Sequence, residues 1–469
     1  MSERSGKAPR EGSLDAPTRH PLRWQEPEFT DPEKLDAEMR RVFDICHGCR
    51  RCFNLCDSFP RLFDLIDESE TGELDAVPSE RFKHVVDACT LCDMCFMTKC
   101  PYVPPHEFDL DFPHLMLRYR AMEQAQGKTD FVARELGRTD RNGRLLGPIS
   151  GVVNWATDED NPLTRPPMHA VLGIHREAHL PRYHSKAFVQ RAKEMGQGSE
   201  ASAPAGETAQ ADEPEVPAAG RKAVLYATCF VNYNNPGIGE ALHEILTHNG
   251  VALETVHPGC CGMPKLEQGD IAAVAESAEK VTEALIPYVD EGHDIVALVP
   301  SCALMLKFEW PLILPENENV KRLAAATFDP SQYIVDIAKK EGLAPGLKPL
   351  DGPVSMHLAC HARAQNMGAK AVEMLRLIPE MQVKPIERCS GHGGSWGVMK
   401  ENFEVALKVG RPAARTALKN ETPYVASECP LASEHILQGM RKLDADKTPP
   451  RTWHPLELFA MAYGFGPEA

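Results

Sequence analysis

The chain has 469 residues, of which 43% are hydrophobic, and it carries a formal net charge of −16. This length predicts roughly two to four domains with apolar cores. The acidic balance argues against general nucleic-acid binding, which needs a basic surface. No apolar run is long enough to cross a bilayer, and the polar N-terminus lacks the apolar core of a secretory signal. We therefore expect a cytoplasmic protein.

The chain contains 15 cysteines, an odd number that suits a complete set of disulfides poorly. In a reduced cytosol, clustered cysteines indicate metal or redox chemistry. Composition predicts six segments in chain order, and their bounds are expectations. They are a disordered tail (1–30), a helical domain with two dense cysteine runs (31–120), a helical or irregular connecting region (121–195), a disordered linker rich in Gly, Ala, Ser, Pro and Glu (196–220), and two α/β domains (221–345 and 346–469).

The first predicted helix, DPEKLDAEMRRVFDIC, begins with an Asp-Pro start signal at Asp31 and leads into the first cysteine run. A [4Fe–4S] cubane needs one thiolate for each of four irons, and three cysteines at two-residue intervals are typical of its binding loop. Both runs have this spacing. The first is Cys46, Cys49, Cys52 and Cys56, and the second is Cys89, Cys92, Cys95 and Cys100, followed by Pro101.

In two-cluster ferredoxins the fourth cysteine of each run binds the other cluster. We therefore predict one cluster on Cys46, Cys49, Cys52 and Cys100, and a second on Cys89, Cys92, Cys95 and Cys56. Two departures from the bacterial pattern are one extra residue before Cys100 and Asp57 in place of proline after Cys56. Structural zinc is the alternative, but zinc knuckles have no use for a third cysteine at the same pitch. Such paired clusters pass single electrons.

After the linker, strand patterns alternate with helix patterns, which predicts a parallel α/β sheet. The strands are expected at 222–228, 251–256 and 294–300, with a helix at 237–250. This half also repeats: Cys229, Cys260, Gly262 and Cys302 match Cys360, Cys389, Gly391 and Cys429 at nearly constant spacing. The cysteines follow strands, where open α/β sheets bind ligands. The two glycines are expected to let the backbone approach a cofactor.

The repeated motifs resemble those of the cysteine-rich CCG-domain iron–sulfur oxidoreductases, which are related to heterodisulfide reductase. The motifs are ATCFVNYNNPG, GCCGMPKLEQGD and VPSCALM, then LACHARAQNMG, RCSGHGGSWG and SECPLAS. The domain order looks most like that of the C subunits of anaerobic glycerol-3-phosphate dehydrogenases. The resemblance covers residues 35–465 apart from 196–220. It implies an α+β multidomain fold: an N-terminal all-α, two-cluster ferredoxin-like module followed by two duplicated α/β CCG domains.

A full motif of this family supplies five cysteines. The first repeat keeps Cys229, Cys260, Cys261 and Cys302, with Met305 in the fifth place. The second keeps Cys360, Cys389 and Cys429, with Ser390 and Ala432 in the other places. These departures argue against heterodisulfide chemistry. The seven cysteines are predicted to bind an additional iron–sulfur cluster or a metal, with buried free thiols as the alternative.

His357 and His361 lie four residues apart, so they would share a face if both were on one helix. No Glu follows His357, so the zinc-protease pattern is absent. The histidines between His169 and His184 are expected to be packed or solvated. No G-x-G-x-x-G follows the strand at 222–228, and no flavin signature is found.

The resemblance implies an electron-transfer subunit of an oxidoreductase complex. Electrons would come from a partner dehydrogenase, a flavoprotein, and would pass through two [4Fe–4S] clusters and the CCG half to a quinone or another acceptor. Membrane contact would be peripheral, on the inner face of the cell membrane. One alternative is a self-standing, heterodisulfide-reductase-like enzyme acting on a small disulfide. The other is a non-enzymatic scaffold that holds zinc.

Overall fold

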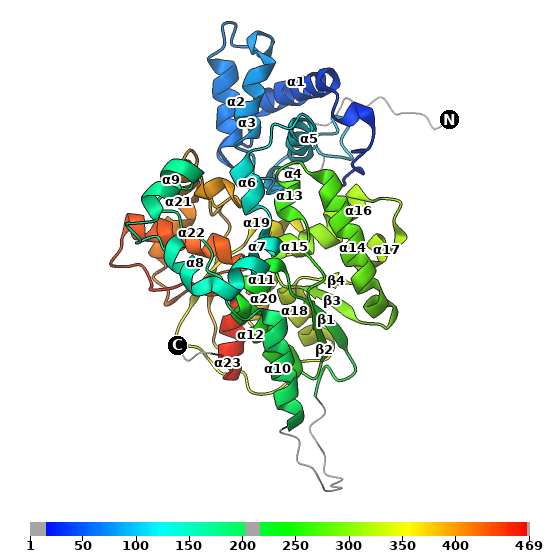
Figure 1. The fold of residues 1–469 in the computed structure, drawn as a ribbon, viewed down its shortest axis with the longest axis vertical. Helices are drawn as coiled ribbons and strands as arrows, with labels where there is room; N and C mark the ends of the chain where they lie inside the picture. The colour runs from blue at the N-terminus through cyan, green and yellow to red at the C-terminus, as the bar shows by residue number, and fades with distance from the viewer. Residues whose placement is uncertain (1–15, 202–215, 467–469) are drawn as a thin grey trace. The chain divides into compact units, whose positions relative to one another are not determined.

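The computed structural model describes residues 16–201 and 216–466 (Figure 1). These residues form two compact units, one with residues 16–128 and 267–269, the other with residues 129–266 and 270–466. Residues 1–15 of the predicted tail and 202–215 of the predicted linker lie outside the described residues. The bounds of the six predicted segments stay predictions.

The first unit is helical, as predicted. Asp31 caps the first helix by accepting a hydrogen bond from the Lys34 amide, so the Asp-Pro signal marks its start. Phe43 packs edge-to-face on Phe82, with ring centroids 5.1 Å apart, in a core of buried phenylalanine, leucine and methionine side chains. The helices are α1 (Pro32–Cys49), α2 (Ser58–Asp67), α3 (Phe82–Val86), α4 (Met94–Thr98) and α5 (Phe112–Ala125).

Arg19 anchors part of the segment for which composition predicts a disordered tail. Its guanidinium lies 2.6 Å from a carboxylate oxygen of Asp93 and 2.9 Å from one of Asp111. It also covers the ring of Phe96, 4.4 Å from the centroid. The Thr18 amide donates to the carbonyl of Pro104. These partners are distant in sequence, so composition around Arg19 gives no sign of them.

The second unit contains two parallel sheets, which confirms the predicted parallel α/β architecture of both repeats. The first sheet has the order β2-β1-β3-β4. Its strands are β1 (Lys222–Tyr226), β2 (Ala252–Val256), β3 (Asp294–Ala297) and β4 (Thr327–Phe328). The second has the order β6-β5-β7, with β5 (Val354–His357), β6 (Val383–Ile386) and β7 (Tyr424–Ser427). Thus β5, β6 and β7 occupy the places of β1, β2 and β3.

The duplication extends beyond the cysteine motifs. Trp453 forms a parallel bridge with Ala426 of β7, in the position that β4 has beside β3. The sequences around these positions, Thr-Phe-Asp-Pro at 327–330 and Thr-Trp-His-Pro at 452–455, also match. Each leads into a helix whose N-cap side chain, Asp329 or His454, accepts a backbone hydrogen bond. The repeat therefore includes a fourth strand position and its helix.

The two repeats exchange their last helices. The helix after β4, α18 (Pro330–Lys340), packs against α20 (Lys370–Leu375) of the second repeat. The helix after Trp453, α23 (Pro455–Tyr463), packs against α12 (Pro236–His248) of the first repeat (Figure 1). The other helices of the repeats include α11 (Cys229–Tyr233), α14 (Ile271–Asp290), α15 (Pro300–Leu304), α19 (Cys360–Ala364), α21 (Phe403–Asn420) and α22 (Pro430–Leu443).

The connecting region is helical in the structure. Its helices are α6 (Phe131–Leu136), α7 (Thr139–Leu146), α8 (Ser150–Thr157), α9 (Arg165–Leu172) and α10 (Phe188–Ala201). Helix α10 runs into the first six positions of the predicted linker. Across the described residues, none of the helices has the length and apolar character needed to cross a membrane.

Candidate functional site

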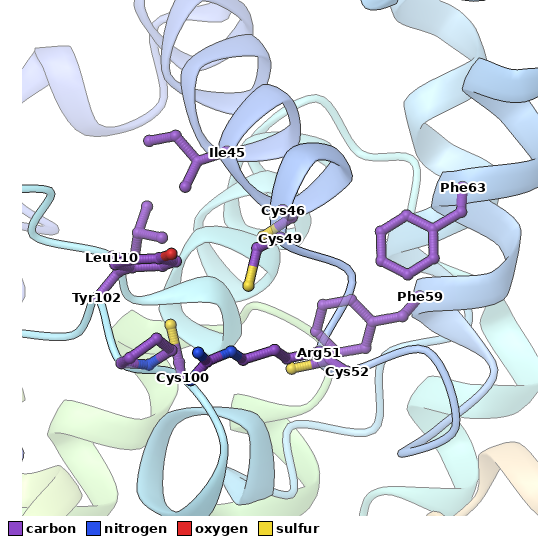
Figure 2. A pocket seen from close by; sticks show the side chains of 11 residues that line it. Ile45, Cys46, Cys49, Arg51, Cys52, Phe59, Phe63, Cys100, Tyr102 and Leu110 are labelled. Carbon is purple, nitrogen blue, oxygen red and sulfur yellow. The ribbon is translucent and has the colours of Figure 1, made fainter. Parts of the chain in front are cut away.

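Four cysteines of the first unit line one pocket, and they come from both runs. They are Cys46, Cys49, Cys52 and Cys100. Figure 2 shows the sulfur atoms of Cys49 and Cys100 turned toward the same space, with Phe59 and Phe63 on the α2 side. The remaining lining residues are Ile45, Arg51, Pro101, Tyr102 and Leu110. These are the four cysteines that the sequence assigns to one cluster, although the assignment itself stays a prediction.

Backbone geometry brings these thiols together. Cys46 and Cys49 lie on the last turns of α1, which ends at Arg50 in a left-handed conformation with φ 52°. The chain reverses direction at Arg50, and this turn brings Cys52 to the same pocket. Cys100 lies two residues after the end of α4. Burial raises the pKa of its thiol, and the Tyr102 and Val103 amides, which point at the sulfur, oppose part of this increase.

The other four cysteines also gather across the two runs. Burial raises the pKa of Cys56, and the neighbouring Cys92 and Cys89 raise it further. The amides of Ser58 and Phe59, at the start of α2, have the opposite effect because they donate to the Cys56 sulfur. Burial also raises the pKa of Cys95, and the neighbouring thiols raise it further; these are Cys92, Cys89, Cys52 and Cys56. The Cys56 thiol therefore lies near the second run.

Burial and mutual repulsion oppose ionisation of these thiols. Burial raises the pKa of Cys52 to about 12, with contributions from Cys100 and Cys49. Burial, followed by Cys100, Cys52 and Cys49, raises the pKa of Cys46 well above its ordinary value. Without a metal these thiols therefore stay protonated, and because thiolates are the metal-binding form, binding of a metal centre would displace their protons. Four converging thiols in an apolar pocket fit the donor set of a [4Fe–4S] cluster.

The four cysteines of the first repeat meet at the carboxyl edge of its sheet. Tyr226 ends β1 level with Val256 of β2 and Ala297 of β3, so the following loops start side by side. The sulfur atoms of Cys229 and Cys260 lie 3.8 Å apart, and those of Cys261 and Cys302 lie 3.1 Å apart. Burial raises the pKa of Tyr226, and all four of these thiols raise it further, which places them around one tyrosine.

The connecting region contributes to this thiol group, which sequence analysis missed. The hydroxyl of Thr139, at the start of α7, lies 3.1 Å from the sulfur of Cys229 and 3.6 Å from that of Cys260. A threonine in a helical segment some ninety residues before Cys229 gives no signal of such a contact. Met305, in the fifth motif place, is fully buried at the start of a π-helical stretch, Met305–Glu309.

The second repeat has a sparser and more open arrangement. Its cysteines follow β5, β6 and β7, and these strands end level at His357, Ile386 and Ser427. Cys360 begins α19, Cys429 is the N-cap of α22, and Cys389 is exposed. The Cys389 sulfur accepts a hydrogen bond of 3.3 Å from the Gly391 amide.

His357 and His361 do not lie on one helix, because β5 ends at His357 and only His361 lies on α19, so the condition for a shared helix face is not met. Both ring nitrogens of His357 have partners: the hydroxyl of Ser427 at 2.8 Å and the carbonyl of Arg388 at 3.0 Å. Burial lowers the pKa of His357 to about 4, so the ring is neutral. A histidine with both nitrogens engaged ties loops together and has no lone pair left for a metal.

The glycines of the two motifs make room for neighbouring helices. Gly262 and Gly391 have φ of 89° and 81°, which favours glycine. A Cβ at Gly262 would meet Val274 of α14 at 3.3 Å, and one at Gly391 would meet the carbonyl oxygen of Ala406 of α21 at 2.0 Å. Both glycines therefore let helix backbone and side chains approach closely, and the expectation that they also let the backbone approach a cofactor stays a prediction.

The fold and these motifs define a class: residues 223–307 and 354–432 match the cysteine-rich domain model CCG, and both repeats belong to this family. The chain is similar to the C subunit of anaerobic glycerol-3-phosphate dehydrogenase from Escherichia coli K12, with 26% identity over 337 residues, 70% of this chain and 76% of the relative.

Two further relatives cover less of the chain. The B subunit of fumarate reductase (CoM/CoB) from Methanothermobacter marburgensis is 28% identical over 251 residues, 52% of this chain and 47% of that protein. Lactate utilization protein A of Geobacillus kaustophilus is 30% identical over 186 residues, 38% of this chain and 74% of that protein. Two of these three relatives are, by name, oxidoreductase subunits.

Proposed function

We propose that this chain is the iron–sulfur electron-transfer subunit of an oxidoreductase complex. A flavoprotein dehydrogenase is the proposed electron donor, two [4Fe–4S] clusters carry the electrons in the first unit, and a centre on the CCG cysteines passes them to a quinone or another acceptor. The relatives named as subunits of a dehydrogenase and of a reductase support membership in such a complex. We place the complex in the cytoplasm, in peripheral contact with the inner face of the membrane.

The observation that carries this proposal is the mixing of the two cysteine runs. Cys100 lies in the pocket of Cys46, Cys49 and Cys52, and Cys56 lies near Cys92 and Cys89. This arrangement supports the proposed exchange of fourth ligands, which is the pattern that two-cluster ferredoxins use. Two zinc knuckles would need no such exchange.

The residues around the first unit's thiols have defined tasks in this proposal. When bound, the clusters would supply reversible one-electron storage. Phe59 and Phe63 keep water from one side of the Cys46 pocket, which lowers the local dielectric. The amides directed at the sulfurs of Cys56 and Cys100 stabilise negative charge on those ligands. The chain's own groups thus favour bound thiolates over free ones.

A self-standing reductase is the second candidate, and the adjacent Cys260–Cys261 pair favours it. The two thiols of this pair face different partners, Cys229 and Cys302 respectively. A non-enzymatic zinc scaffold is the third candidate, and the sparse cysteine set of the second repeat would suit it.

One experiment separates these candidates: anaerobic purification of the full chain, with iron, acid-labile sulfide and zinc counted per chain and co-purifying proteins identified. About eight irons with matching sulfide supports the two predicted clusters, and about twelve or more adds a centre in the CCG half, at four irons per cluster. Zinc without sulfide would overturn the proposal in favour of the scaffold. Turnover of a small disulfide by the chain alone would favour the reductase.

A further inference from the structure

A helix from outside the repeat lies against the four thiols of the first CCG repeat, Cys229, Cys260, Cys261 and Cys302. Helix α7 belongs to the connecting region, and its first residue, Thr139, places a hydroxyl 3.1 Å from the sulfur of Cys229. The same hydroxyl lies 3.6 Å from the sulfur of Cys260. One oxygen therefore reaches two of the four sulfurs, within the distance limit for hydrogen bonds that involve sulfur.

A polar network fixes this hydroxyl in place. The carboxylate of the next residue, Asp140, lies 2.8 Å from the Nε2 of His257 and accepts a hydrogen bond of 3.3 Å from the hydroxyl of Tyr233. The other ring nitrogen of His257 is hydrogen-bonded to the carbonyl of Ala227, next to the end of β1. Asp140 is thereby tied to the loops after β1 and β2, which also carry Cys229 and Cys260.

Close packing holds the rest of α7 against the site. A Cβ at Gly143 would lie 2.1 Å from the ring of Tyr233, so only glycine allows α7 to approach α11 this closely. Tyr233 lies on α11, the helix that begins at Cys229. The helix that presents Thr139 and the helix that carries Cys229 therefore form one packed unit.

We propose that Thr139 is a positioning residue that donates a hydrogen bond to the thiolate sulfurs of Cys229 and Cys260 and raises the reduction potential of the centre they hold, with Asp140 and His257 fixing its place. This inference rests on the proposed function, because it requires a redox centre on the first repeat. Hydrogen bonds to ligand sulfurs are among the factors that set such potentials. A donor stabilises the reduced state more, since that state carries more negative charge.

Three variants of the full chain test the proposal by redox titration monitored by electron paramagnetic resonance. Thr139→Val keeps the shape and removes the hydroxyl, and the centre of the second unit should shift to a more negative potential. Thr139→Ser should restore the wild-type potential. Thr157→Val is the matched control, because the Thr157 hydroxyl donates to the carbonyl of Val153 within α8 and has no contact with a cysteine sulfur among the described residues. The two predicted centres of the first unit serve as internal references that should not move.

The outcomes distinguish this inference from the proposed function. An unchanged potential in Thr139→Val, or a Ser variant that behaves like the Val variant, overturns the role of Thr139 and leaves the electron-transfer function standing. A wild-type chain with only about eight irons overturns both the CCG centre and the role of Thr139. Circular dichroism of each variant verifies the fold. Asp140→Asn is a second test of the same role, because it loosens the position of Thr139 and should shift the reduction potential in the same direction by a smaller amount.

Discussion

Glu428 accepts a hydrogen bond of 3.2 Å from the backbone amide of Ala359, and this bond joins the loop after β7 to the loop after β5. Burial raises the pKa of Glu428 to about 8, and the nearby Asp329 carboxyl contributes in the same direction. Glu428 therefore keeps its proton at neutral pH. The residues that follow these two positions are Cys429 and Cys360, so a neutral carboxyl group fixes the spacing of two predicted ligands.

This buried carboxyl group predicts a pH dependence of stability. The pKa is higher in the folded state than in the unfolded state, where it is about 4.3. Glu428 thus contributes stability below the unfolded value that is lost as pH rises toward 8. The free energy of unfolding of wild type, relative to Glu428→Gln, should fall by about 1 kcal/mol per pH unit between pH 5 and 8. Denaturant titrations at three pH values measure this, with the exposed Glu401→Gln as control. Parallel profiles would contradict it.

Serine substitutions in pairs test the exchange of fourth ligands. If Cys46 and Cys100 hold the same cluster, the double variant Cys46→Ser/Cys100→Ser should lose about four irons, no more than either single variant. The pair Cys46→Ser/Cys56→Ser should lose about eight, since it affects both clusters. The opposite pattern in the iron and sulfide counts would mean that each run binds its own cluster.

Arg19→Met should destabilise the first unit. It removes the partner that Asp93 and Asp111 share, and breaking a buried ion pair costs about 3 to 5 kcal/mol. Asp111 keeps its contacts with His114, so the main loss is at the buried Asp93. Arg23→Met is the control, because Arg23 is exposed and its pair with Glu26 spans 3.7 Å. The melting temperature and the rate of cluster loss in air are measured for both variants, and Arg19→Met should melt at the lower temperature and lose its clusters faster. Equal behaviour of the two would show that the Arg19 pairs do not hold the segment.

Alanine at the two motif glycines should have unequal effects. Both positions have positive φ, which costs roughly 1 to 2 kcal/mol for alanine in either variant. Gly391→Ala adds a clash with the backbone carbonyl of Ala406, whereas Gly262→Ala meets a side chain of Val274 that can move slightly. Gly391→Ala should therefore unfold at a lower denaturant concentration than Gly262→Ala. The reverse order would mean that the α21 backbone yields more easily than the structure implies.

Local sequence patterns predicted many strands and helix starts of this molecule. The side-chain contacts between residues far apart in the chain could not be predicted in this way. The strand that ends at Tyr226 and the start of α1 at Asp31 follow from an apolar run and a capping residue. The bridge at Trp453 is too short to produce a strand pattern. Arg19 and Thr139 take their roles from partners far along the chain, and no local periodicity encodes such contacts.

The exchange of α18 and α23 between the repeats makes each repeat depend on the other for its packing. Each repeat covers the other with its final helix, so a single copy would leave an apolar surface bare. The two repeats are therefore expected to unfold as one cooperative unit, in which neither half is stable without the other.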